Sequence, residues 1–180
     1  MSTRSHINIV LKDNSIKSIY VHSDGYPDGV GRCLIDNYNS YEKAVELFNY
    51  GNASYLGSTI NECSFYGRDW NRDEEPARKY NNVDHYMLDM RGDIWIEYIY
   101  LFQNGIWKVS SLEYAKTKNG FDDSIGYFSK FLPVREHKNF TGEKHNGTEV
   151  KMLGDLKKML EGSFGADGVL FQGQKLKKPN

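Results

Sequence analysis

The sequence predicts an α+β fold: an antiparallel sheet of about four strands with a hairpin at each end of the domain, helices packed on one face, and a C-terminal amphipathic helix. Three observations support this class. Two β-rich runs joined by a short turn open the chain, helical patterns follow in residues 30–51 and 83–91, and two further β-rich runs flank Asn104-Gly105. This order of elements is typical of helices packed against an antiparallel sheet.

The first part of the chain carries clear start and stop signals. Apolar and polar residues alternate over residues 7–11, and the turn "KDNS" lets "IKSIYVHS" return as the antiparallel partner. Residues 30–38 suit a short helix with Asp28 near its N-cap. A second helix is capped by Ser40 and ends at Gly51. These signals predict a hairpin followed by two helices.

The middle of the chain is less regular. Residues 61–82 show no clean period, which predicts a long surface excursion of the kind that often carries function. A helix over residues 83–91 follows. The strand before Asn104 has apolar residues on both faces, so we expect it to be central, and the Asn-Gly dipeptide predicts a type I′ turn. Residues 113–134 fit either another hairpin or a short helix.

A change in composition divides the chain. Residues 1–134 form the predicted α+β core domain. Residues 135–148 are polar and contain glycine, which predicts a linker, and residues 149–180 predict a helix followed by a basic tail. The helix is indicated by apolar residues at helical spacing: Val150, Leu153, Leu156, Met159 and Leu160.

Bulk composition argues against several classes of protein. With 23 basic and 24 acidic residues the net charge is −1, which fits neither a strongly basic nucleic-acid binder nor an acidic nucleic-acid mimic. Cys33 and Cys63 form no C-x-x-C pair and have no metal-ligand spacing. No apolar run approaches ~18 residues, so we expect no membrane association and a cytoplasmic location.

The stretch "HSDGYPDGVGRC" concentrates glycines just before the first predicted helix. Gly25, Gly29 and Gly31 permit a positive φ or the close approach of another backbone, and free amides at this point can bind an anion such as a phosphate. The spacing matches neither the dinucleotide fingerprint nor the P-loop. Two ordinary turns explain the same residues. A binder of a small signalling nucleotide is therefore one functional alternative.

Titratable residues suggest another alternative. His22 and Asp24 are two residues apart, so on an extended segment they share one face, where a carboxylate can orient an imidazole for proton transfer. They are the candidate catalytic residues of an RNA-processing enzyme. Together with carboxylates of residues 69–75 they would form an Mg²⁺-dependent nuclease site. Surface or core roles explain the same pair, and outside this alternative we expect no metal and no cofactor.

Cations and aromatic residues are interleaved in the irregular segment. Arg68, Trp70 and Arg72 have the character of an RNA or protein contact, but Asp69 and the acidic residues after it neutralise much of the charge. The mixture favours a protein contact over a phosphate-tracking groove, and a solvated loop is the simpler explanation. The basic C-terminal region offers candidates for phosphate contacts, or a solvated helix face: Lys157 and Lys158.

The opening "MSTRSHINIV" and the stretch from Ile19 to Tyr38 together resemble a family of small proteins carried by bacteriophages and conjugative elements. Its members begin with Ser-Thr-Arg-Ser and a strand, and a second strand leads into His-x-Asp-Gly-Tyr-Pro, a Val-Gly pair and a helix ending in Tyr. The segments "YGRDWNRDEE" and "EYIYLFQNGIWKV" are also similar, so the resemblance covers most of residues 1–112. The matching residues of the first stretch are Ser2, Thr3, Arg4, Ser5, Tyr20, His22, Asp24, Gly25, Tyr26, Pro27, Val30, Gly31 and Tyr38.

The resemblance implies a role against host defence inside a bacterial host cell, since some proteins similar to this one are type II anti-CRISPRs, which inhibit Cas9. It implies interference with the Cas9–guide RNA complex, in some cases with shortening of the guide. We therefore expect an interaction protein that binds a Cas9-type nuclease or its guide RNA, with RNA processing and nucleotide binding as alternatives. The candidate binding residues are Arg4, His22, Asp24, Tyr26, Gly29, Gly31, Arg68, Asp69, Trp70, Arg72, Lys157 and Lys158.

Overall fold

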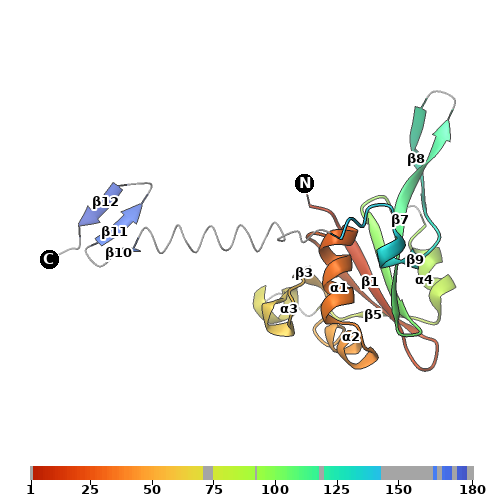
Figure 1. The fold of residues 1–180 in the computed structure, drawn as a ribbon, viewed down its shortest axis with the longest axis horizontal. Helices are drawn as coiled ribbons and strands as arrows, with labels where there is room; N and C mark the ends of the chain where they lie inside the picture. Colours follow the sequence, from red (N-terminus) through yellow and green to blue (C-terminus); the bar gives the residue numbers. More distant parts are fainter. Residues whose placement is uncertain are drawn as a thin grey trace. The chain divides into compact units, whose positions relative to one another are not determined.

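A nine-stranded mixed sheet organises the first of the two units into which the chain divides, Met1–His145 and Asn146–Asn180. The computed structural model describes residues 2–70, 75–91, 93–117, 120–142, 164–165, 168–171 and 174–177. Figure 1 shows the elements along the chain. No helix in this described part combines the length and the apolar character that a bilayer span requires.

The main path of the sheet runs β4-β3-β2-β1-β6-β7-β8, while β5 pairs with β2 and β9 pairs with β7. Two of the pairings, β1 with β6 and β2 with β3, are parallel. In chain order the strands are β1 (Ser5–Val10), β2 (Ile16–Val21), β3 (Ala53–Tyr55), β4 (Ser64–Phe65), β5 (Arg78–Tyr80), β6 (Tyr98–Gln103), β7 (Ile106–Thr117), β8 (Gly120–Phe128) and β9 (Leu132–Pro133). The helices are the π-helix η1 (Pro27–Gly31), α1 (Arg32–Asn37), α2 (Tyr41–Leu47), the 3₁₀-helix η2 (Ile60–Glu62), α3 (Tyr66–Trp70), α4 (Val83–Asp89) and the 3₁₀-helix η3 (Val134–Glu136).

Both predicted hairpins are present. β1 and β2 pair antiparallel, with Ile7 opposite Ile19. β6 and β7 join through Asn104 and Gly105, whose φ angles of 54° and 77° are both positive, as a type I′ turn requires. Residues 113–134, for which the sequence left two alternatives, contain the hairpin between β7 and β8.

The predicted sheet of about four antiparallel strands with helices on one face is wrong. The sheet is larger and mixed, because β3, β4 and β5 pair with or beside β2, and β6 pairs in parallel with β1 from far along the chain. Strands of two or three residues are too short to show a period of two. Helices also cover both faces: residues of α1 and α2 share a core with Tyr100, whereas Tyr86 of α4 shares a second core with Ile99.

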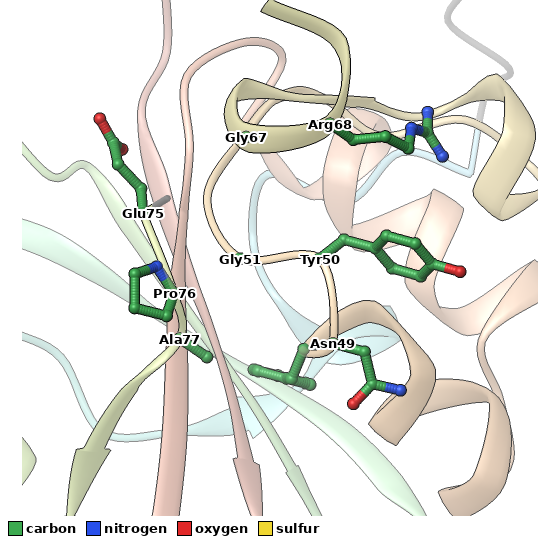
Figure 2. A pocket seen from close by; sticks show the side chains of 9 residues that line it. Asn49, Tyr50, Gly51, Gly67, Arg68, Glu75, Pro76 and Ala77 are labelled. Atoms are coloured by element: carbon green, nitrogen blue, oxygen red, sulfur yellow. The ribbon is translucent and has the colours of Figure 1, made fainter. Parts of the chain in front are cut away.

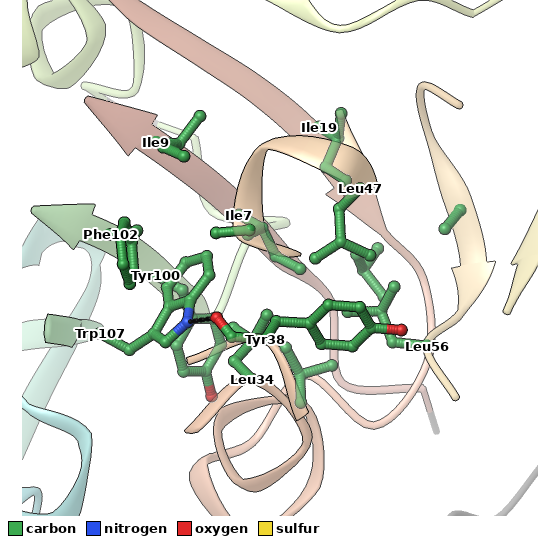
Figure 3. Packing of buried hydrophobic residues seen from close by; sticks show 14 of the residues in the cluster. Ile7, Ile9, Ile19, Leu34, Tyr38, Leu47, Leu56, Tyr100, Phe102 and Trp107 are labelled. Atoms are coloured by element: carbon green, nitrogen blue, oxygen red, sulfur yellow. Dashed lines mark hydrogen bonds between the residues drawn. The ribbon is translucent and has the colours of Figure 1, made fainter. Parts of the chain in front are cut away.

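The larger core lies between the sheet and the helices α1 and α2. Its side chains come from β1, β2, β6 and β7 on one side and from the two helices on the other, as Figure 3 shows. Trp107 is almost fully buried, and its indole Nε1 donates a hydrogen bond of 2.8 Å to the carbonyl of Tyr38, just after α1. This bond ties the second hairpin to the first helix and satisfies a buried carbonyl.

In the second unit, three short strands pair antiparallel: β10 (Phe164–Gly165), β11 (Gly168–Phe171) and β12 (Gln174–Lys177). The predicted amphipathic helix over residues 149–164 lies outside the described residues except for its last residue, Phe164, which begins β10 and is therefore strand. Arg72, Lys157 and Lys158 also lie outside the described residues. Those predictions therefore stay predictions.

Candidate functional site

The glycine-rich corner before α1 is held by contacts within the chain. The amide of Val30 donates to the carbonyl of Asp24 at 2.8 Å, and the amide of Gly29 donates to the carbonyl of Tyr26 at 2.9 Å. A Cβ on Gly29 would lie 2.2 Å from the Asp24 oxygen, and one on Gly31 would lie 3.1 Å from the Tyr100 ring. This geometry favours turns and close packing over an anion cradle, because these two amides already have acceptors.

The carboxylate of Asp28 also forms hydrogen bonds within the chain, to residues 141 and 142. Its carboxylate accepts hydrogen bonds from the amides of Thr141 and Gly142, at 2.9 and 3.0 Å, and from the Thr141 hydroxyl at 2.6 Å. Arg32 adds a bond of 2.6 Å to the Gly142 carbonyl. Two successive backbone amides around a carboxylate form the kind of concavity that binds anions, so the corner holds residues 141–142 against the domain.

The Arg68–Asp69 pair is likewise engaged locally. Arg68 donates to the carbonyls of Ile60 and Cys63 and to the carboxylate of Asp69, which in turn accepts from the amide of Phe65. The hydrogen-bonded guanidinium lowers the pKa of Asp69. This network holds α3 against the segment from Ile60 to Phe65.

A cavity of about 360 Å³ lies next to Arg68, between Tyr50 and Gly51 on one side and Glu75–Ala77 on the other, as Figure 2 shows. The guanidinium carbon of Arg68 lies 5.7 Å from the centre of the Tyr50 ring. Trp70 is 50% exposed on α3 and donates to the Ser64 hydroxyl at 2.9 Å. The guanidinium of Arg68 already donates hydrogen bonds to two carbonyls and one carboxylate. It therefore has little donor capacity left for a ligand in this cavity.

A second, larger cavity lies on the face of the sheet that α4 covers. His6 of β1 stands opposite Tyr20 of β2, and Ser18 of β2 stands opposite Arg78 of β5, so these side chains share one face. The cavity measures about 430 Å³ and is lined by His6, Ser18, Tyr20, Asn52, Arg78, Asp89, Met90, Asp93 and Ile96. We call it the α4 cavity.

The interior of the α4 cavity has fixed hydrogen bonds. His6 Nδ1 lies 3.0 Å from the Tyr86 hydroxyl, and burial lowers the pKa of His6 to about 4, so the imidazole is neutral at pH 7. Asp89 accepts from the Tyr80 hydroxyl at 2.8 Å, and Asp93 accepts from the amide of Trp95 at 2.8 Å. The hydroxyl of Tyr80 on β5 and the backbone amide of Trp95 therefore orient the two carboxylates.

Beside this cavity, half-buried Arg4 and exposed Trp95 form a cation–π contact, which we call the Arg4–Trp95 pair. The guanidinium of Arg4 lies 5.3 Å from the centre of the Trp95 ring, and Trp95 is 67% exposed. Burial raises the pKa of the Tyr20 hydroxyl while Arg4 acts against that increase, which places Arg4 near the cavity wall. The Tyr20 hydroxyl also lies 2.8 Å from Nδ1 of His22.

The structure thus brings together only part of the predicted site. Arg4 and His22 lie beside the α4 cavity. By contrast, the other described candidates lie in the glycine-rich corner or on α3, where contacts within the chain engage them: Asp24, Tyr26, Gly29, Gly31, Arg68, Asp69 and Trp70. Sequence reasoning missed the cavity residues, although polar His6 and Tyr20 on strands with apolar neighbours were a signal for a polar sheet face.

The cysteines do not have the properties of nucleophiles. Burial raises the pKa of the Cys33 thiol to about 12, and burial also raises the pKa of Cys63. Because the thiolate is the reactive form, both side chains act as small core residues at neutral pH.

The hydrogen bonds of Ser111 and His137 also favour a structural role over a catalytic one. His137 Nδ1 accepts the amide of Asn139 at 3.2 Å, so the proton of the neutral imidazole sits on Nε2, which faces the Ser111 hydroxyl at 3.2 Å. In that tautomer the histidine donates to the serine and cannot take its proton. In the described part of the chain, no group of three or more His, Cys, Asp or Glu residues is placed to hold a metal ion.

Comparisons with protein-family models, with curated proteins and with solved structures each found no match for this chain. The family resemblance of the N-terminal stretch stays a prediction.

Proposed function

We propose that the protein is a counter-defence binding protein: an anti-CRISPR inhibitor that engages a Cas9-type RNA-guided nuclease or its guide RNA complex. The observation that carries the binding role is the Arg4–Trp95 pair, with Trp95 67% exposed beneath a guanidinium. The identity of the target is argued from the resemblance of the opening stretch, in which Arg4 and His22 are matching residues.

Several features support a contact surface at this place. Tryptophan and arginine are the residues that most often dominate binding energy at protein interfaces. Ile94, the residue before Trp95 in the chain, is also 49% exposed. Single exposed hydrophobic residues need no explanation, but two adjacent ones beside a cation are typical of an interaction site.

The buried thiols and the Ser111–His137 tautomer favour binding over nucleophilic catalysis by those groups. The guide-shortening alternative would use His22 and Asp24 instead, and His22 already forms a hydrogen bond with the Tyr20 hydroxyl. We therefore place inhibition by binding first.

The test measures both association and inhibition. Purified protein is mixed with Cas9-type nucleases loaded with guide RNA, and co-migration on a sizing column and target-DNA cleavage are recorded. We expect Trp95→Ala to weaken inhibition by about 10-fold or more, since an interface hot spot is worth about 2 kcal/mol. Ile106→Ala is the control, because Ile106 is 50% exposed at the start of β7 and is not a candidate binding residue, and it should change inhibition less than about 2-fold.

Two outcomes would overturn the proposal. One is the absence of co-migration with every nuclease–guide complex tested, and the other is unchanged inhibition by Trp95→Ala. Guide RNA recovered from each mixture is also sized on a gel. A shortened guide that persists in Trp95→Ala but disappears in His22→Ala would instead favour the RNA-processing alternative.

A further inference from the structure

The α4 cavity combines groups of opposite charge that form no direct ion pair, although Arg78 and Asp89 both interact with the Tyr80 hydroxyl. Arg78 enters from β5, while Asp89 and Asp93 come from the end of α4 and the segment after it. The ion pairs found among the described residues, at up to 4.0 Å, do not include Arg78, Asp89 or Asp93. About 430 Å³ of space lies among these side chains, which is within the range of cavities that hold small ligands.

Hydrogen-bonding capacity remains on both sides of this space. Asp93 uses Oδ1 for the amide of Trp95, and no hydrogen bond from a described residue reaches its Oδ2. An ionised carboxylate only accepts hydrogen bonds, whereas a guanidinium only donates them. The cavity therefore offers acceptors at Asp93 and Asp89 and donors at Arg78.

The balance of charge restricts the ligand. Because His6 is neutral at pH 7, the cavity holds one cation and two carboxylates. A phosphate inside it would face both carboxylates, and a simple cation would face Arg78. A neutral ligand with hydrogen-bond donors on one edge and acceptors on another avoids both of these like-charge repulsions. Apolar contacts are available from the Tyr20 ring and from Met90 and Ile96.

We propose that the α4 cavity binds a guanine base. The Watson–Crick edge of guanine carries two adjacent N–H donors, at N1 and N2, which match the acceptor oxygens of Asp93 and Asp89. Its O6 and N7 atoms are acceptors that match Arg78, since arginine reads this edge of guanine in nucleic-acid complexes. Adenine, cytosine and uracil do not present two adjacent donors, so the cavity discriminates against them.

The base comes either from a free guanine nucleotide or from an unpaired guanine in RNA, because unstacked bases in single strands are read by their edges and by stacking. Arg4, which lies near the cavity wall at Tyr20, is a cation available to a phosphate outside the cavity in either case. This inference goes beyond the proposed function, since it does not depend on any nuclease.

Binding is measured by titration calorimetry in two arms. The first arm uses GMP against AMP, CMP and UMP, and the second uses a short single-stranded RNA with one central guanine against the same RNA with adenine there. We expect a preference for guanine of about 10-fold or more, the lower limit for one good bidentate contact. Preference in the first arm assigns a free nucleotide, and preference only in the second assigns RNA.

Matched variants test the two contacts. Asp93→Asn and Arg78→Gln should each reduce affinity for the guanine probe by about 10-fold. Asp84→Asn on the exposed surface of α4, and Lys79→Gln, whose side chain points to the other face of β5, should leave it within about 2-fold. All four positions are exposed or half-buried, and melting curves check that each variant folds.

No binding in either arm, equal affinity for guanine and adenine, or a guanine preference that survives both Asp93→Asn and Arg78→Gln would overturn this assignment. These binding measurements use neither the Trp95→Ala variant nor a nuclease. Failure of the guanine site is therefore distinguishable from failure of the proposed function.

Discussion

Lowering the pH should destabilise this fold through His6. Burial lowers the pKa of this imidazole from 6.5 to about 4, with Arg78 adding to the decrease and Asp93 and Asp89 opposing it. Between these two pH values the unfolded chain binds a proton that the folded chain rejects. The stabilisation is therefore complete above about pH 6.5 and is lost as the pH falls toward 4.

The size of the effect follows from the same pair of pKa values. A decrease from 6.5 to about 4 corresponds to about 3 kcal/mol of unfolding free energy when the histidine is fully protonated. At pH 5 most of the unfolded chain is protonated at this site and little of the folded chain is, so about 2 kcal/mol should be lost relative to pH 7.

The assay is urea unfolding followed by tryptophan fluorescence at pH 7 and pH 5. Wild type should lose about 2 kcal/mol more than His6→Gln over this interval, because carboxylates titrate in both proteins and cancel in the difference. His85→Gln, which removes an exposed histidine of α4, is the control and should behave as wild type. Equal losses in wild type and His6→Gln would refute the buried, neutral imidazole.

Three further substitutions test the scaffold. Asp28→Ala removes the acceptor that holds residues 141–142 and should cost about 2 kcal/mol in urea unfolding, whereas a change below about 0.5 kcal/mol would contradict this clamp. Gly29→Ala places a Cβ 2.2 Å from a backbone oxygen and should lower the melting temperature by several degrees, and an unchanged melting curve would show that the corner has room. Trp107→Phe leaves the Tyr38 carbonyl without its indole donor and should cost about 2 kcal/mol, to be checked by calorimetric melting.

The candidate site was only partly predictable from the sequence. Arg4 was identified from the resemblance of the opening stretch, and His22 from that resemblance and from its spacing to Asp24. Both interact with Tyr20, which lines the α4 cavity. Asp93 and Arg78 could not be assigned to the same site, because one follows a helix and the other lies on a three-residue strand. Only the pairing of β5 with β2 places Arg78 on the cavity face.

The glycine corner shows the opposite case, in which a strong signal in the sequence marks close packing within the chain rather than a binding site. The sequence correctly marks this corner as conformationally restricted, but it does not reveal what approaches the glycines. In the structure Gly25 lies against Thr3, and Gly31 lies against Tyr100 and Val134. Contacts from such distant positions in the chain carry no signal in the local spacing of residues.

By itself the sequence determined the elements whose formation depends on neighbouring residues. The Asn104-Gly105 turn, the first hairpin and the capped helix at Ser40 all follow from local backbone preferences and short-range hydrogen bonds. Tertiary structure decided the size of the sheet, the parallel pairing of β1 with β6, and the α4 cavity. These depend on contacts between segments many residues apart, whose free energy comes from burial and packing, and which leave no short-range period in the chain.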